Sequence, residues 1–130
     1  MAPARASTKA LHIMVVDDNI DAAKTVAMLL ELDGHRVTIA HSAEEALRSA
    51  RDESPQAFLL DIGLPGMDGY ELARQLRGLA GNANALLIAL TGYGQAQDLE
   101  RSQAAGFNHH FEKPIDPAKL LQLLATLGEA

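Results

Sequence analysis

The fold is decided by residues 57–69, which read Ala57-Phe58-Leu59-Leu60-Asp61-Ile62-Gly63-Leu64-Pro65-Gly66-Met67-Asp68-Gly69. Four apolar residues run directly into a carboxylate, as is typical of a short buried strand that ends at Asp61. The residues after it are rich in glycine and contain a proline, which predicts irregular backbone. This segment therefore predicts a buried strand with a carboxylate at its carboxyl end.

The same alternation of apolar runs and turns continues in both directions along the chain. Segments with helical periodicity separate the runs, which is the pattern of βα units in a parallel sheet. We therefore predict an α/β fold: one doubly wound (βα)5 domain over residues 10–128, with sheet order 2-1-3-4-5 and helices on both faces. The predicted strands span Leu11–Val16, Arg36–Ala40, Ala57–Leu60, Ala85–Leu90 and Asn108–Phe111.

The helices between these strands carry recognisable start and stop signals. The first is expected from Ile20 to Asp33, and Ser42-Ala43-Glu44-Glu45 is a capping box that opens the second. The fourth, roughly Gln95 to Ala105, has few apolar residues and should be the least firmly anchored. Asp116 and Pro117 are predicted as the N-cap and first residue of the last helix.

Composition narrows the class of protein. The 130 residues suit one compact domain, and a formal charge of -6 without a basic cluster argues against direct nucleic-acid binding. The chain has no cysteine, which excludes disulfides and thiolate chemistry. Its apolar runs are too short to cross a bilayer, and residues 1–9 lack the apolar stretch of a signal peptide. We expect a cytoplasmic protein that does not bind membranes, with a disordered leader at residues 1–9.

Polar residues follow the predicted strands at their carboxyl ends. Asp17 and Asp18 follow the first strand, Asp61 the third, Thr91 the fourth and Lys113 the fifth. In a doubly wound sheet these ends share one edge, beside the point where the strand order reverses. We therefore expect three carboxylates to converge there with a hydroxyl and an ammonium.

Three converging carboxylates repel one another unless a cation neutralises them. Oxygen donors without His or Cys favour a hard ion, and Mg²⁺ accepts one or two carboxylates while keeping positions for phosphate oxygens. Asp18 and Asp61 are the expected side-chain ligands, and Asp17 is expected to ligate directly or through water. The Gly63 carbonyl is expected to supply a further oxygen, and Mn²⁺ is the expected substitute for Mg²⁺.

A carboxylate beside such a metal is equipped to attack a phosphoryl group, as in enzymes that form an aspartyl phosphate. The protein then has mainly to position the group and neutralise its equatorial oxygens. Asp61 is the expected nucleophile. Mg²⁺, Lys113 and the Thr91 hydroxyl each have one of the three oxygens to bind.

Four ordered motifs resemble those of two-component response-regulator receivers. The resemblance covers about Leu11 to Leu127 and implies a phosphoacceptor at Asp61. It also implies an acid pocket with Asp17 and Asp18, a switch hydroxyl at Thr91, a phosphate-binding Lys113 and a cis peptide before Pro114. The motifs are Val15-Val16-Asp17-Asp18-Asn19, Leu59 to Gly69, Leu90-Thr91-Gly92-Tyr93 and Glu112-Lys113-Pro114.

Two positions depart from the commonest pattern of that family. His110 stands where Tyr or Phe is usual, so an aromatic switch becomes a partly titratable one or is muted. Gly92 stands where Ala is more usual, which leaves the phosphoryl pocket more open, and Tyr93 partly covers it again. Phosphorylation is expected to switch the surface formed by the fourth helix, the fifth strand and the fifth helix.

The resemblance also implies partners. A sensor histidine kinase or a histidine-phosphotransfer protein would donate the phosphoryl group, and a downstream protein of unknown identity would respond; a phosphorylation-dependent homodimer stays open. The domain is not expected to be an enzyme, beyond promoting its own phosphorylation and dephosphorylation. A stand-alone regulator and the receiver portion of a hybrid sensor histidine kinase both stay open. Residues 90–94 and 107–110 resemble receivers attached to hybrid kinases.

Three rival functions share parts of this pattern. A flavodoxin-like FMN carrier has the same strand order, but the loop Asp17-Asp18-Asn19 would repel a flavin phosphate. A phosphatase with external substrates would need a general acid and a substrate cap, for which the chain has no large insertion. A receiver that serves only as a scaffold would not need the acidic, hydroxyl and lysine positions together.

Each motif taken alone also has a structural interpretation. Asp17-Asp18 is typical of a helix N-terminus, and Lys113-Pro114 of a surface loop. His109 and His110 are adjacent on a strand, so they point to opposite faces and cannot chelate one ion. Three further histidines are interpreted as structural or solvated, and two aromatic residues as packing residues: His12, His35 and His41, and Tyr70 and Phe107.

Overall fold

The computed structural model describes residues 10–64, 66–67, 69–79, 85–92, 99–113 and 115–129, with the backbone alone at 99 and 127–129. Strands and helices alternate throughout this part of the chain, as predicted. The elements are β1 (His12–Val16), α2 (Ile20–Leu32), β2 (Arg36–Ala40), α3 (Ala43–Glu53), β3 (Ala57–Asp61), α4 (Gly69–Arg77), β4 (Leu86–Thr91), α5 (Leu99–Ala105), β5 (His109–Glu112) and α6 (Pro117–Glu129).

The five strands form one parallel sheet of order β2-β1-β3-β4-β5. β1 and β3 are therefore neighbours at the point where the strand order reverses, as the sequence predicted. Val16 pairs with Leu60, and Asp61 pairs with Leu90, so the carboxyl ends of these strands lie at one edge. Any site in a sheet of this kind is expected at that edge.

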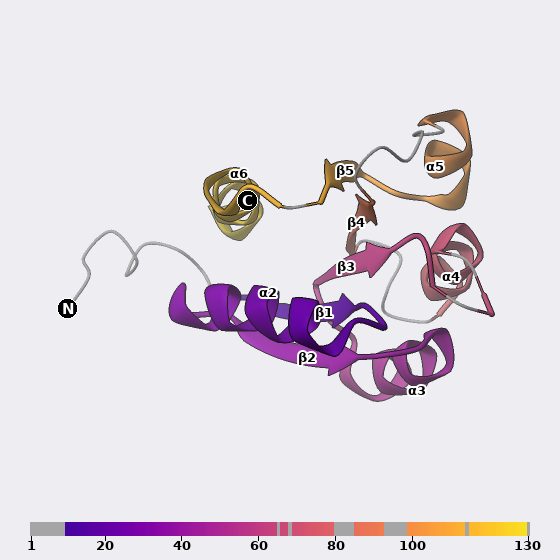
Figure 1. Cartoon of the computed structure of the whole chain (residues 1–130), viewed down its shortest axis with the longest axis horizontal. Coiled ribbons are helices and arrows are strands. Elements are labelled where there is room, and N and C mark those ends of the chain that lie inside the picture. Colours follow the sequence, from indigo (N-terminus) through magenta and orange to yellow (C-terminus); the bar gives the residue numbers. More distant parts are fainter. Residues whose placement is uncertain are drawn as a thin grey trace.

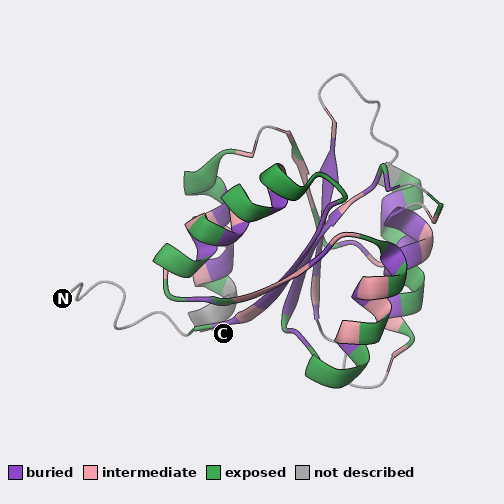
Figure 2. Ribbon diagram, turned by 60° about the horizontal axis from the view of Figure 1, so that its bottom comes forward, coloured by how far each residue is buried: buried purple, intermediate pink, exposed green. Residues whose placement is uncertain are grey.

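Helices cover both faces of the sheet (Figure 1), with α2 and α6 on one face and α3, α4 and α5 on the other. Alternating strand residues feed the two cores: Met14 and Val16 pack with α3 and α4, whereas Ile13 and Val15 pack with α2 and α6. The strands are accordingly buried between helices whose outer faces are exposed (Figure 2). The doubly wound architecture is confirmed.

Side-chain caps fix where the helices begin. Asn19 Oδ1 accepts a hydrogen bond from Ala22 N at 3.0 Å at the start of α2. Ser42 Oγ accepts from Glu45 N at 3.2 Å, and the Glu45 carboxylate accepts from His41 N at 2.8 Å, one residue before the usual partner in a capping box. Asp116 Oδ1 accepts from Ala118 N at 3.0 Å, which confirms the predicted cap of α6.

Several boundaries differ from the predicted ones by one residue. Asp33 is the C-cap of α2 rather than its last residue, and Gly34 follows in the left-handed region at φ 95°. β3 extends to Asp61 because the ladder continues with Ile62 N donating to Leu90 O at 3.0 Å. The predicted start of the fourth helix at Gln95 lies outside the described residues.

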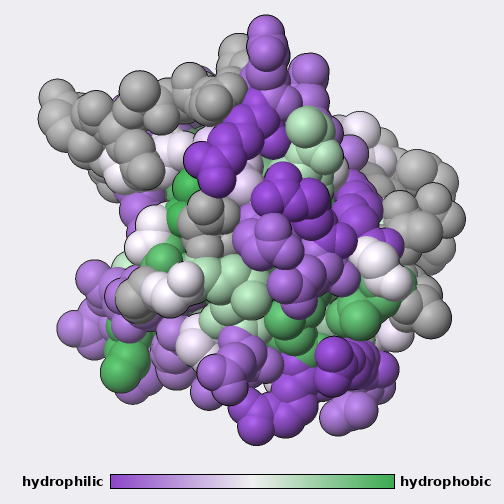
Figure 3. Space-filling model, turned by 90° about the vertical axis from the view of Figure 1, so that its right-hand side faces the viewer, coloured by the Kyte–Doolittle hydropathy of each residue, from purple (hydrophilic) through white to green (hydrophobic). Residues whose placement is uncertain are grey.

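The surface on the side of α4 and α5 is largely hydrophilic, with smaller hydrophobic areas between the polar side chains (Figure 3). Within the described ranges, no helix has the length and apolar character needed to cross a membrane.

Candidate functional site

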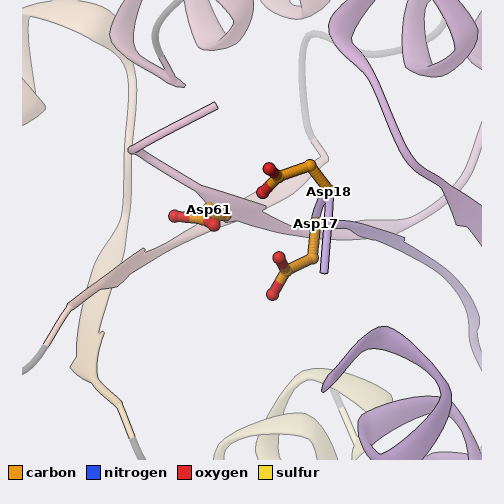
Figure 4. A group of neighbouring side chains, drawn as sticks. All are labelled: Asp17, Asp18 and Asp61. Atoms are coloured by element: carbon orange, nitrogen blue, oxygen red, sulfur yellow. The ribbon is translucent and has the colours of Figure 1, made fainter. Parts of the chain in front are cut away.

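Three carboxylates meet at the carboxyl edge of the sheet, as the strand order predicted. Asp17 and Asp18 directly follow β1, and Asp61 is the last residue of β3. One oxygen from each lies within 4.8 Å of the others, and the three side chains point to the same side of the sheet edge (Figure 4). Asp17 is buried, Asp61 half-buried and Asp18 exposed. We call these three residues the acidic cluster.

Lys113 joins two members of the acidic cluster. Its ammonium donates to Asp17 Oδ2 at 2.9 Å and to Asp61 Oδ2 at 3.2 Å. Its backbone N–H donates to the Thr91 carbonyl at 2.8 Å, so β4 fixes the start of the loop after β5. Lys113 therefore supplies a positive charge at the point where the carboxylates converge.

Backbone N–H groups orient the other oxygens of the same two carboxylates. Asn19 N donates to Asp17 Oδ1 at 3.0 Å, and Gly63 N donates to Asp61 Oδ1 at 2.9 Å. Each carboxylate thus has one oxygen held by the loop that follows its strand and the other held by Lys113. Such fixed acceptors are preorganised for a cation or an electrophile.

The electrostatics of the site follow from partial burial. Burial raises the pKa of the Asp61 carboxyl above its ordinary value, which outweighs the opposing effects of the Gly63 hydrogen bond and the Lys113 charge; the nearby Asp17 adds to the rise. Burial alone lowers the pKa of Lys113, but the hydrogen bonds and charges of Asp17 and Asp61 reverse the effect and raise it. Lys113 is held as a cation, whereas the ionised form of Asp61 is disfavoured and gains from further positive charge.

Thr91 ends β4 at the same edge of the sheet. Its side chain is 1% exposed, and its hydroxyl has no hydrogen-bond partner among the described residues. A buried hydroxyl without a partner is costly, which marks Thr91 as a group suited to an acceptor that arrives at the site. Gly92, next to it, is half-buried; Tyr93 and Pro114, with its expected cis peptide, lie outside the described residues.

A largely apolar, partly open pocket of about 630 Å³ lies between α2 and α6, and Asp17 and Lys113 are among the residues that line it. Apolar side chains surround it, among them Val26 on α2 and Leu120 on α6. One side of the ion pair between Asp17 and Lys113 therefore faces an apolar pocket.

His110 on β5 lies away from the acidic cluster and contacts α5. Its Nε2 is hydrogen-bonded to the hydroxyl of Ser102, which is fully buried, and its ring lies 6.2 Å from that of Phe107. Burial lowers the pKa of His110, and the neighbouring His109 lowers it further. This contact links strand β5 to the helix that the sequence identified as weakly anchored.

The acidic cluster fits a hard divalent cation. Its donors are all oxygens, and they converge within the distances that one ion spans.

Two of the histidines that the sequence predicts to be structural have structural contacts. His12 is bonded to Thr38 and Glu53, and His35 is buried and accepts a hydrogen bond from Leu11 N. His41, which is also expected to be structural or solvated, donates a hydrogen bond from Nδ1 to the Asp17 carbonyl oxygen at the edge of the site. Its place at the carboxyl end of β2 is the signal that could have revealed this contact.

The chain belongs to the response regulator receiver domain family, whose model matches residues 13–125. It is therefore a receiver domain of two-component signalling, as the four motifs indicated.

Relatives of different lengths share this domain. An uncharacterized 14.6 kDa protein of Leptolyngbya boryana is 37% identical over 88% of this chain and 87% of its own length. Sensor histidine kinase AruS of Pseudomonas aeruginosa is 37% identical over 97% of this chain but only 13% of its own length. The receiver domain of sensor histidine kinase PA1611 from Pseudomonas aeruginosa, solved with magnesium in its active site cleft, has a TM-score of 0.82 and 30% identity, with 93% and 99% of the two chains covered.

Proposed function

We propose that Asp61 is the phosphoacceptor of this receiver and that its phosphorylation depends on Mg²⁺. The observation that carries this proposal is the position of Lys113, whose ammonium lies between Asp17 and Asp61. Asp61 is the member of the acidic cluster that is half-buried, oriented by Gly63 N–H and beside a fixed cation. These are the properties that an attacking carboxylate needs.

The metal ligands that we propose are Asp17, Asp18, Asp61 and the Gly63 carbonyl, for Mg²⁺ or Mn²⁺. The ion would supply positive charge to the carboxylates and to a phosphoryl oxygen. Support comes from the all-oxygen donor set and from the magnesium reported in the related PA1611 receiver domain. Gly92 and Tyr93 are proposed to border the entrance to the site that binds the metal and the phosphoryl group.

In the proposed step, a carboxylate oxygen of Asp61 forms a bond to phosphorus while the bond between phosphorus and the donor breaks. The electron pair of that bond leaves with the donor. The leaving group is acetate when the donor is acetyl phosphate, and imidazole when the donor is a phosphohistidine, whose freed ring nitrogen takes up a proton from solvent. Lys113 and the Thr91 hydroxyl bind two of the phosphoryl oxygens. Thr91 thereby gains the acceptor that its buried hydroxyl lacks among the described residues.

The response is proposed to be a population shift of the surface formed by α5, β5 and α6. Thr91 moves toward the phosphoryl group, and His110 on β5 transmits the change to α5 through Ser102. The proposed donors are a sensor histidine kinase or a histidine-phosphotransfer protein, in keeping with the sensor kinases among the relatives. The domain is proposed to promote only its own phosphorylation and dephosphorylation, in the cytoplasm, and to pass the signal to a downstream protein or a second copy of itself.

Incubation with acetyl phosphate, with Mg²⁺ or with EDTA, followed by intact mass measurement, tests the proposal. We expect a gain of one phosphoryl group that needs Mg²⁺, is removed by hydroxylamine and is absent in Asp61→Asn. Asp52→Asn is the matched control, because Asp52 is an exposed carboxylate on α3. Phosphoramidate tests the same site with a donor whose phosphorus is bound to nitrogen. A gain that persists in Asp61→Asn would overturn the assignment.

A further inference from the structure

The end of β2 and the residue that follows it are hydrogen-bonded to the loop that carries Asp17 and Asp18. Asp17 N donates to Ala40 O at 3.1 Å, and His41 Nδ1 donates to the Asp17 carbonyl oxygen at 3.2 Å. This carbonyl belongs to the peptide group that joins Asp17 to Asp18. His41 therefore contacts the peptide plane from which the Asp18 side chain projects.

The members of the acidic cluster differ in how they are held. The carboxylates of Asp17 and Asp61 are each fixed by a backbone N–H and by Lys113. The Asp18 side chain is exposed, and no hydrogen bond holds its carboxylate among the described residues. Its placement near Asp61 (Figure 4) depends on the orientation of its backbone.

His41 is itself firmly placed. Its backbone N–H donates to the Glu45 carboxylate at 2.8 Å, and Ser42 Oγ caps Glu45 N at 3.2 Å. The ring is half-buried between the start of α3 and the loop after β1. The imidazole can therefore hold the Asp17–Asp18 peptide in a fixed position relative to the N-terminus of α3.

We propose that His41 is a positioning residue for the metal ligand Asp18. Its Nδ1–H holds the Asp17–Asp18 peptide in the orientation that brings the Asp18 carboxylate to the other two members of the acidic cluster. This inference rests on the proposed metal site. Residues that orient ligands without touching the metal commonly set metal affinity.

A purely structural tie between two loops is the alternative, and side-chain geometry separates the two. Asn places an amide N–H where Nδ1 stands, whereas Gln places it where Nε2 stands. His41→Asn should therefore keep the contact with the Asp17 carbonyl, and His41→Gln and His41→Ala should lose it. Thermal unfolding of all three variants reports separately on stability.

Isothermal titration of the full unphosphorylated chain with Mg²⁺ tests the proposal. We expect His41→Ala and His41→Gln to bind Mg²⁺ about fivefold more weakly, the equilibrium effect of one lost hydrogen bond. His41→Asn should bind within twofold of the wild type, by the same reasoning about retained contacts. His109→Ala, which removes an exposed histidine of β5, is the matched control and should not change the affinity.

Asp18→Asn provides the decisive background, because the effect of His41 is proposed to act through Asp18. In Asp18→Asn, adding His41→Ala should cause no further loss of Mg²⁺ affinity. An equal loss in both backgrounds, or wild-type affinity in His41→Ala, overturns the positioning role while the metal site stands. A wild-type chain that does not bind Mg²⁺ overturns the metal site itself, and this inference with it.

Discussion

The ammonium of Lys113 lies 2.9 Å from Asp17 Oδ2, although the two residues are 96 positions apart in the chain. The same ammonium lies 3.2 Å from Asp61 Oδ2. One lysine thus joins the ends of β1 and β3 to the loop after β5. This relationship couples the charge balance of the site to the placement of the β5–α6 loop.

Replacing Lys113 should lower the stability of the domain and increase the stabilisation that Mg²⁺ provides. Lys113→Ala should lower the free energy of unfolding by about 1 to 3 kcal/mol, because it leaves the charge of the buried Asp17 without its cation, while Lys113 itself is partly exposed. Mg²⁺ should then stabilise the variant more than it stabilises the wild type, since the ion replaces the missing charge. Urea unfolding with and without Mg²⁺ measures both effects.

Lys119→Ala is the control for this prediction, because Lys119 is exposed on α6. Equal stabilisation by Mg²⁺ in Lys113→Ala and in the wild type would show that Lys113 does not share the charge balance of the metal site.

The buried hydroxyl of Thr91 leads to a second prediction. Thr91→Val removes a polar group that has no partner among the described residues, so the free energy of unfolding should rise by about 1 kcal/mol. The variant should nevertheless lose the response to phosphorylation, measured as NMR shift changes in α5 and β5. Thr91→Ser keeps the hydroxyl and should keep the response. A fully responsive Thr91→Val would rule out the switch role.

Gly69 permits close contact between α4 and the loop after β3. A Cβ atom there would lie 2.6 Å from the Ile62 Cα, so Gly69→Ala should cost about 2 kcal/mol or more in unfolding free energy. Gly78→Ala is the control, because a Cβ at that position meets nothing closer than 3.5 Å. Comparable stability of the two variants in urea would contradict the close contact.

The lowered pKa of His110 predicts a pH dependence of stability. Burial, and next the charge of His109, lower this pKa, so the unfolded chain takes up a proton at a higher pH than the folded chain. The free energy of unfolding should therefore decrease as the pH falls below about 6.5, the ordinary value for histidine, and level off below the folded pKa.

His110→Gln should remove part of this decrease while keeping a polar group near Ser102. His12, whose pKa burial also lowers, should contribute to the decrease that remains. Urea unfolding between about pH 8 and pH 5 gives the slope, on either side of the ordinary histidine value. An unchanged slope in His110→Gln would show that this residue titrates alike in the folded and unfolded chains.

Strand ends explain how much of the site could be predicted from the sequence. The apolar runs fixed the places of Asp17, Asp61, Thr91 and Lys113, because the carboxyl ends of parallel strands share one edge. The extension of β3 to Asp61 was missed, since hydrogen bonding to β4 rather than side-chain character decides where a strand ends.

Contacts between loops were harder to predict. The hydrogen bond from His41 to the Asp17 carbonyl depends on how the loops after β1 and β2 approach each other, which periodicity does not specify. The contact between Ser102 and His110 depends likewise on the rotation of α5 about its axis. The carboxyl end of β2 places His41 near the site, but periodicity does not specify which atom such a single polar residue bonds.

The most direct test of the central claim is to locate the acyl phosphate. The domain is phosphorylated with acetyl phosphate and Mg²⁺ and reduced with borohydride, which converts a phosphorylated aspartate to homoserine, and its peptides are sequenced by mass spectrometry. Our account predicts homoserine at position 61, with Asp17 and Asp18 unmodified. Homoserine at either of those positions instead, or at none of the three, would contradict it.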